Sequence, residues 1–191
     1  WGIAGRSGAQ RGVWRRVLDM NSPSKDFERL GGPVQCAQDR AALDARWKEL
    51  QREAHPDKCA AQGGAAQRVA MQWSVRINEA YRRLKDPLQR AAYLCELRGA
   101  PINAQENTAM PPKFLMEQME WREALEEAQD EQALERLEVQ LRQSRQEVLR
   151  DIEPLLDRDD DPAAAAGQVS ALMFIQRLGR DLPHRLAPPG Q

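Results

Sequence analysis

Apolar residues recur along the first half of the chain every three or four positions, which is the spacing of one face of an α-helix. Two such runs follow each other, at about 40–54 and 65–85. The pattern predicts two amphipathic helices joined as a hairpin. The first run has Leu43, Trp47, Leu50 and Ala54 on its apolar face, and the second has Val69, Trp73, Ile77, Ala80, Tyr81 and Leu84.

The segment His55-Pro56-Asp57-Lys58 separates the two runs. A proline disfavours the helical conformation of the residue before it, so the first helix should end just before His55. The small residues at 59–64, which include two glycines, predict a loop. We therefore expect His55, Pro56 and Asp57 to be exposed at the tip of the hairpin, where they form a compact contact point.

Capping residues mark the ends of several predicted helices. Asp39 is a suitable N-cap for the helix that begins at 40. Asp86 can cap a further helix and Pro87 is favoured at its first position, while Gly99 would end that helix. A short apolar patch before the hairpin predicts a short first helix or a turn. The patch consists of Phe27, Leu30 and Val34.

Three more amphipathic patterns follow a stretch rich in proline and asparagine. They cover about 113–128, 131–156 and 163–182, and their short connections allow an antiparallel bundle. The sequence lacks the alternation typical of strands, so the predicted fold class is all-α. We expect, in order, a disordered or non-native extension, a first domain, a linker and a three-helix domain, with bounds at 1–22, 23–99, 100–111 and 112–186.

Composition narrows the possible functions. The 28 basic and 29 acidic residues nearly cancel, so whole-chain charge argues neither for nor against nucleic acid. The second half, however, is acidic around 117–131, and such a surface repels phosphate. No apolar run approaches the roughly 20 residues of a membrane span. We therefore expect no nucleic-acid partner and no membrane insertion.

Candidate catalytic and metal-binding residues are few. The three cysteines of the chain form no C-x-x-C pair, which argues against a zinc knuckle and favours a reducing compartment. His55 and Cys59 lie four positions apart, but no second pair completes a set of four ligands. The sequence offers two candidate acid–base pairs, His55 with Asp57 and Glu120 with Glu123. No nucleophile can be identified for either pair. We expect no cofactor, no bound metal and no enzymatic activity.

An apolar cluster in the second half leaves two interpretations open. Its members are Leu115, Met116 and Met119, with Met173 or Phe174 from the last helix. Their helical spacing favours core packing. Leu115 and Met116 are adjacent, however, and cannot share one narrow face, so one of them can be exposed. An exposed methionine is adaptable enough to serve a peptide-binding surface.

Three segments together resemble a known family. The sequence LQREAHPDK at 50–58, followed by INEAYRRLKDPLQRAAYL at 77–94, resembles a J domain. The sequence FLMEQMEWRE at 114–123 resembles the HscB (Jac-type) J-domain co-chaperones of iron–sulfur cluster assembly. The resemblance covers about 27–182, and the combination of the two motifs is much more specific than either alone.

The resemblance implies two partners and an architecture of a J domain followed by a C-terminal three-helix bundle. A DnaK-like ATPase chaperone of the HscA type would bind a first set of residues, and the contact would stimulate the partner's ATP hydrolysis. This chaperone-binding set is His55, Pro56, Asp57, Lys58, Arg46, Lys48 and Arg52. The cluster scaffold protein IscU would bind a second set. This scaffold-binding set is Leu115, Met116, Met119, Glu120, Glu123 and Phe174.

Two other functions remain open from the sequence. One is a general J-domain protein with other clients, and the other is a helical protein that uses its second half as a coiled-coil interaction module. For the location, the resemblance favours a cytoplasmic protein of bacterial type. The Arg-rich, acid-poor start resembles a transit peptide, so the mitochondrial matrix is the alternative.

Overall fold

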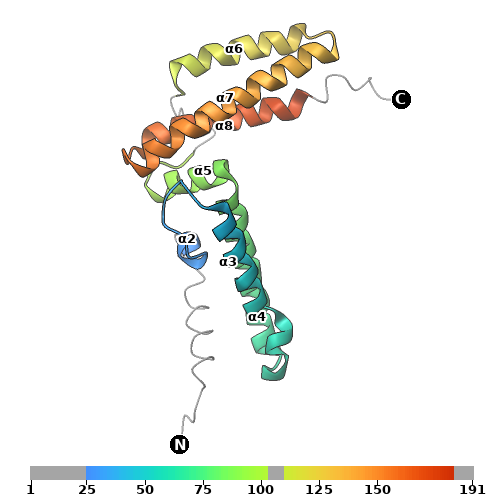
Figure 1. Ribbon diagram of the computed structural model, residues 1–191, viewed down its shortest axis with the longest axis vertical. Helices are drawn as coiled ribbons and strands as arrows, with labels where there is room; N and C mark the ends of the chain where they lie inside the picture. Colours follow the sequence, from blue (N-terminus) through green and yellow to red (C-terminus); the bar gives the residue numbers. More distant parts are fainter. Residues whose placement is uncertain (1–24, 103–109, 183–191) are drawn as a thin grey trace, which may run out of the picture. The chain divides into compact units, whose positions relative to one another are not determined.

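The computed structural model describes residues 25–102 and 110–182 (Figure 1). Its described ranges contain helices and no strand, which confirms the all-α prediction. The expected N-terminal extension, most of the expected linker and the last residues of the expected three-helix domain lie outside these ranges. The elements are α2 (Asp26–Arg29), α3 (Arg40–Glu53), the 3-10 helix η3 (Pro56–Gln62), α4 (Gly64–Lys85), α5 (Pro87–Leu97), α6 (Pro112–Glu127), α7 (Glu131–Asp157) and α8 (Pro162–Asp181).

The described chain divides into two compact units. The hairpin unit comprises α2, α3, η3 and α4, and the bundle unit comprises α5 to α8 together with residues 35–37. The sequence placed α5 with the first domain, whereas its buried side chains pack against α7 and α8. An amphipathic pattern predicts that a helix has a buried face but cannot say which element covers it. The predicted domain bounds, which end the first domain at 99, therefore stay a prediction. The compact units of the structure divide after Lys85.

The hairpin unit is closed by an apolar core and by a polar seam between α3 and α4. Asp39 caps α3 as predicted, and its carboxylate accepts a hydrogen bond from the Ala41 N–H at 2.9 Å. The core joins α2, α3 and α4 through Phe27, Leu43, Leu50, Ile77 and Leu84. Along the seam, Trp47 stacks on Tyr81 with ring centroids 4.6 Å apart. This stacked pair of aromatic rings therefore holds α3 and α4 together near the middle of the hairpin.

The 3-10 helix η3 begins within the tip at Pro56 and covers most of the stretch at 59–64 where the sequence predicted a loop. Pro56 occupies its first position, which needs no N–H donor, and the preceding His55 is extended with φ −64° and ψ 128°. The helix ends at Gly63, whose φ of 97° lies in the left-handed region that glycine favours. The loop prediction is wrong here because small residues permit a tight helical turn as readily as an irregular one. Val34 of the apolar patch is also exposed, while Phe27 and Leu30 are buried.

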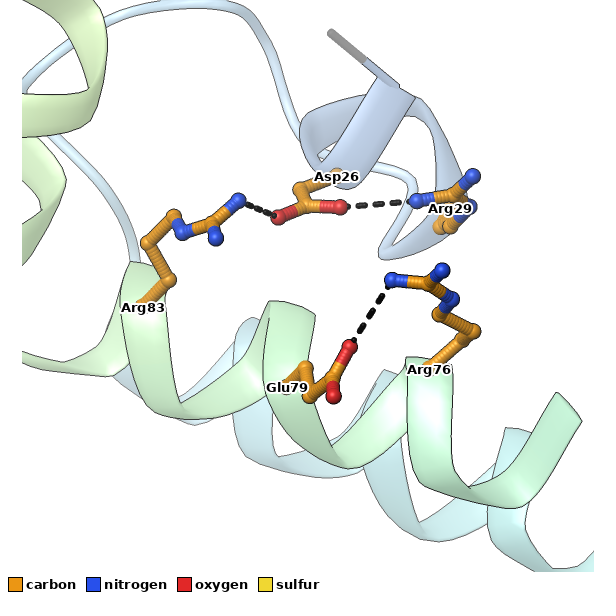
Figure 2. Close-up of polar contacts among 5 residues, drawn as sticks. All are labelled: Asp26, Arg29, Arg76, Glu79 and Arg83. Carbon is orange, nitrogen blue, oxygen red and sulfur yellow. Dashed lines mark hydrogen bonds and ion pairs between the residues drawn. The ribbon is translucent and has the colours of Figure 1, made fainter. Parts of the chain in front are cut away.

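The four-residue helix α2 is anchored by a buried carboxylate. Asp26 is 4% exposed, and its two oxygens lie 2.8 Å from Arg29 Nη1 and 2.7 Å from Arg83 Nη1 of α4 (Figure 2). A helix this short is not stable by itself, so tertiary contacts must hold it. Figure 2 also shows a second, more exposed pair on α4, between Arg76 and Glu79 at 3.1 Å.

The bundle unit is built from long helices with capped starts. Asp86, Asp130 and Asp161 each accept a hydrogen bond from a backbone N–H in the first turn of α5, α7 and α8, at 2.9, 2.7 and 3.0 Å respectively. The apolar stripe of α7 is buried at five of the positions that its periodicity predicts, namely Leu134, Leu137, Leu141, Val148 and Ile152. The pattern placed Leu155 at the end of the stripe, but Leu155 is half-buried and Leu156 is buried instead. Within the described range 110–182 there are three helices, α6, α7 and α8, and each begins and ends within about a residue of its predicted bounds.

Candidate partner-binding surfaces

The tip is a small set of polar groups in a defined conformation. The Asp57 backbone N–H donates to His55 Nδ1 at 3.3 Å, and the Lys58 N–H donates to the His55 carbonyl at 3.0 Å. The side chains of His55 and Asp57 are 58% and 90% exposed. The tip thus presents an imidazole that is hydrogen-bonded to the backbone and, beside it, an exposed carboxylate, and both suit contact with another protein.

The predicted basic residues of α3 do not all lie together. Lys48 and Arg52 are exposed and one turn apart, so they share a face of α3 near the tip. Arg46 precedes Lys48 by two positions, or about 200° around the helix. It pairs with Glu49 at 2.7 Å, and its side chain lies beside Gly31, which follows α2. The structure therefore brings Lys48 and Arg52 together and separates Arg46 from them.

The second predicted surface lies on α6 and is apolar at its centre. Leu115, Met116 and Met119 are 48%, 68% and 74% exposed. The core-packing interpretation is therefore wrong for these three residues, and both members of the adjacent pair are at the surface. The core face of α6 carries Phe114, Trp121 and Leu125 instead.

Two carboxylates lie on the same side of α6 as the exposed methionines. Glu120 follows Met116 by four positions and Glu123 follows Met119 by four, so the spacing places them together, and both are exposed. We call Leu115, Met116, Met119, Glu120 and Glu123 the α6 patch. An apolar centre with acidic neighbours is complementary to a protein surface that offers apolar and basic groups.

Phe174 of α8 reaches the same region through aromatic contacts. Its ring meets Phe114 edge to face, with centroids 5.8 Å apart. The Arg122 guanidinium carbon lies 5.3 Å from the Phe174 ring centroid, a cation–π arrangement. Arg122 was not among the predicted residues, although its position seven residues after Leu115 places it on the flank of the α6 patch. The half-buried Phe174 thus joins α8 to that flank.

The described residues do not offer an evident reactive centre. Burial raises the pKa of both the Cys36 and the Cys95 thiols to about 11, so neither is an activated nucleophile at neutral pH. No group of three or more metal-ligating side chains lies together in the described ranges. Across the same ranges, none of the helices is both long and apolar enough to cross a membrane.

Comparisons with known proteins agree with the resemblance read from the motifs. Residues 110–182 match the family described as "HSCB C-terminal oligomerisation domain". The "Co-chaperone protein HscB homolog" of Cupriavidus taiwanensis is 51% identical over 81% of this chain and 89% of its own length. The protein of the same description from Burkholderia multivorans is 50% identical over 82% of this chain and 90% of its own length.

Solved structures extend the same likeness to the fold. "Chaperone HscB from Vibrio cholerae" has a TM-score of 0.70 and 35% identity, over 83% of this chain and 95% of that one. The human co-chaperone HscB has a TM-score of 0.77, over 98% of this chain and 95% of its own, and at 23% identity it supports the fold alone. The chain therefore belongs to the HscB family, whose members are co-chaperones rather than enzymes.

Proposed function

We propose that the chain binds an iron–sulfur cluster scaffold protein of the IscU type, delivers it to a DnaK-like chaperone of the HscA type and stimulates that partner's ATPase. The result would be maturation and transfer of the cluster. The observation that carries this proposal is the presence of two exposed surfaces with different chemistry in a member of a co-chaperone family. The tip belongs to the hairpin unit, and the α6 patch belongs to the bundle unit.

The tip suits an acidic partner that recognises side chains in a defined conformation. His55 and Asp57 are held by backbone hydrogen bonds, and Lys48, Arg52 and Lys58 add exposed positive charge. Charges of this kind raise the association rate and select the partner, while a rigid turn limits the entropy lost on binding. These features support assignment of the tip to the ATPase.

The α6 patch suits the scaffold. Three large apolar side chains can lose their hydration when a partner covers them, and that burial supplies affinity. Glu120 and Glu123 at their side would favour a partner with basic groups. Phe174 would be covered in part by the same partner, because it adjoins the patch through Phe114 and Arg122.

Calorimetric titration of the IscU-type scaffold tests the assignment of the α6 patch. The triple variant Leu115→Ala, Met116→Ala, Phe174→Ala should bind the scaffold at least about tenfold more weakly than the wild type, as expected for loss of central apolar contacts. It should still stimulate the ATPase when the scaffold is left out. Val139→Ala on α7 is a matched control, since Val139 is also 48% exposed but outside the patch. Equal scaffold affinity of the triple variant and the control contradicts the assignment.

A general J-domain protein with other clients would give a different result. It would retain unfolded polypeptides, but not the scaffold, in a pull-down with purified proteins. We also propose a cytoplasmic location in a bacterium, which the bacterial origin of the similar sequences supports. Recovery of the protein in the matrix of a mitochondrion would contradict that location and favour the alternative.

A further inference from the structure

Two large apolar side chains are exposed on α4 and belong to neither of the two predicted binding sets. Met71 is 59% exposed and Val75 is 55% exposed. They are four positions apart, so they lie one above the other on the same face of the helix. Met71 and Val75 do not belong to the core of the hairpin unit, because the buried face of α4 is formed by other residues, among them Ala70, Ile77 and Ala80.

The hydrogen bonds of the α3–α4 seam locate this pair. Ser74 and Asn78 face α3, where the Ser74 hydroxyl donates to Gln51 Oε1 at 2.8 Å and the Gln51 amide donates to Asn78 Oδ1 at 2.8 Å. At about 100° per residue, buried Ile77 lies on one side of the Ser74–Asn78 row. Met71 and Val75 lie on the opposite side. We call that side, which faces away from the core of the hairpin unit, the outer side of the seam.

Lys48 and Arg52 of α3 belong to the same outer side. On α3 it is Trp47 and Gln51 that face α4, through bonds to Asn78 at 2.9 and 2.8 Å. Buried Leu50 lies on one side of the Trp47–Gln51 row, and Lys48 and Arg52 lie on the other. The basic residues of the predicted chaperone-binding set and the exposed apolar pair of α4 therefore form one continuous face of the hairpin unit.

The register of the two helices puts the pair beside the tip end of that face. Arg40 at the start of α3 donates to the Lys85 carbonyl at the end of α4, at 3.1 Å, so the helices are antiparallel. Since Gln51 is level with Ser74, Met71 is level with the last residues of α3, directly before His55. The apolar pair is thus adjacent to the tip rather than at the far end of the hairpin.

The charges around the pair are predominantly basic. Arg68 and Arg82 are exposed and lie seven positions before and after Val75, so they share its face. Glu79, one turn after Val75, is neutralised by Arg76 at 3.1 Å. Asp44, on the outer side of α3, is paired with Arg40 at 2.9 Å.

We propose that Met71 and Val75 form the apolar centre of the surface that binds the ATPase, with Lys48, Arg52 and Arg68 as its cationic rim. This inference rests on the proposed function and adds to it residues outside the tip and outside α3. The matching surface of the ATPase would present one apolar contact surrounded by carboxylates. Met71 supplies a flexible, polarizable side chain that adapts to such a contact, and Val75 supplies a rigid one.

Apolar centre and cationic rim have separable effects on binding. Rim charges act mainly on the association rate and lose their effect as salt screens them. Buried apolar side chains at the centre of an interface act mainly on the dissociation rate, and salt does not screen them. A loss of affinity that persists at high salt is therefore the signature of the apolar centre.

The test is a titration of a purified HscA-type ATPase, which the wild-type chain stimulates, with the full-length variant Met71→Gln, Val75→Gln. Glutamine is a good helix former, so α4 should be retained. The concentration for half-maximal stimulation should rise about tenfold, at 50 mM and at 300 mM salt alike, while the maximum at saturation and the affinity for the scaffold stay unchanged. Val139→Gln is the matched control, and Asp57→Ala reports on the proposed function itself.

Each outcome decides one of the two proposals. If Asp57→Ala loses stimulation but the α4 double variant titrates as the wild type does, the apolar centre is refuted and the proposed function stands. If Asp57→Ala stimulates normally, the proposed function fails. Should circular dichroism show that the glutamine variant is misfolded, Met71→Ala, Val75→Ala replaces it, because alanine has the highest helix propensity. An unchanged half-maximal concentration for that folded variant likewise refutes the apolar centre.

Discussion

The carboxylate of Asp26 lies 2.7 Å from Arg83 Nη1, and this ion pair joins the four-residue helix α2 to α4 across 57 positions of the chain (Figure 2). Asp26 is almost completely buried, and its other oxygen pairs with Arg29. Each of the two carboxylate oxygens therefore faces a cationic partner. The pair explains how so short a helix keeps Phe27 in the core of the hairpin unit.

Replacement of Asp26 by asparagine should destabilise the protein more than loss of an exposed ion pair. The variant leaves the Arg29 and Arg83 guanidinium groups beside a neutral amide at a buried position, which we expect to cost about 2–3 kcal/mol. Glu79→Gln, which breaks the exposed pair with Arg76, should cost under about 0.5 kcal/mol. Urea unfolding measures both. Equal stability of the two variants would show that Asp26 does not anchor α2.

The basic residues of α3 should differ in their effect on the ATPase. Lys48→Ala with Arg52→Ala should raise the concentration for half-maximal stimulation several-fold at low salt, and less at high salt, because these exposed charges act through screened attraction. Arg46→Ala should change this concentration little, since Arg46 lies on another side of α3 and is paired with Glu49. A salt series of stimulation curves for the two variants makes the comparison. A larger effect of Arg46→Ala would refute this division of the predicted set.

The buried thiols should make stability depend on alkaline pH. Burial raises the pKa of Cys36 and Cys95 from 9.0 to about 11 in the folded protein, so the folded state holds these protons more tightly than the unfolded state does. The contribution of these thiols to the free energy of unfolding is complete below pH 9 and declines as the pH rises from 9 towards 11. The free energy of unfolding, measured with urea across this pH range, should fall more steeply with pH for the wild type than for the double variant Cys36→Ala, Cys95→Ala. Parallel pH profiles would mean that these thiols are not protected.

Local signals in the sequence predicted most of the fold. Capping by Asp39 and Asp86 depends on the few residues that follow each of them, and both caps are formed as expected. Contacts between distant elements carried no such signal. The partner of Asp26 and the helices that cover α5 follow from packing, which a period of 3.6 residues does not reveal.

The candidate surfaces were predictable to a similar degree. The motif at 114–123 predicted the residues of the α6 patch, and the structure added that all three apolar members are exposed. The exposure of Met71 and Val75 could not be predicted, because their spacing is equally compatible with a buried helix face. The hydrogen bonds that join Trp47 and Gln51 to Ser74 and Asn78 separate the two sides of α4.

The central claim is that the tip activates an ATPase, and steady-state ATP hydrolysis by a purified HscA-type chaperone tests it most directly. Wild-type chain should stimulate hydrolysis in a saturable manner, and Asp57→Ala at the same concentrations should leave it at the basal rate, because the exposed carboxylate held beside His55 is removed. Scaffold affinity measured in parallel should be the same for both proteins. Full stimulation by Asp57→Ala, with its fold and scaffold binding intact, would contradict the account.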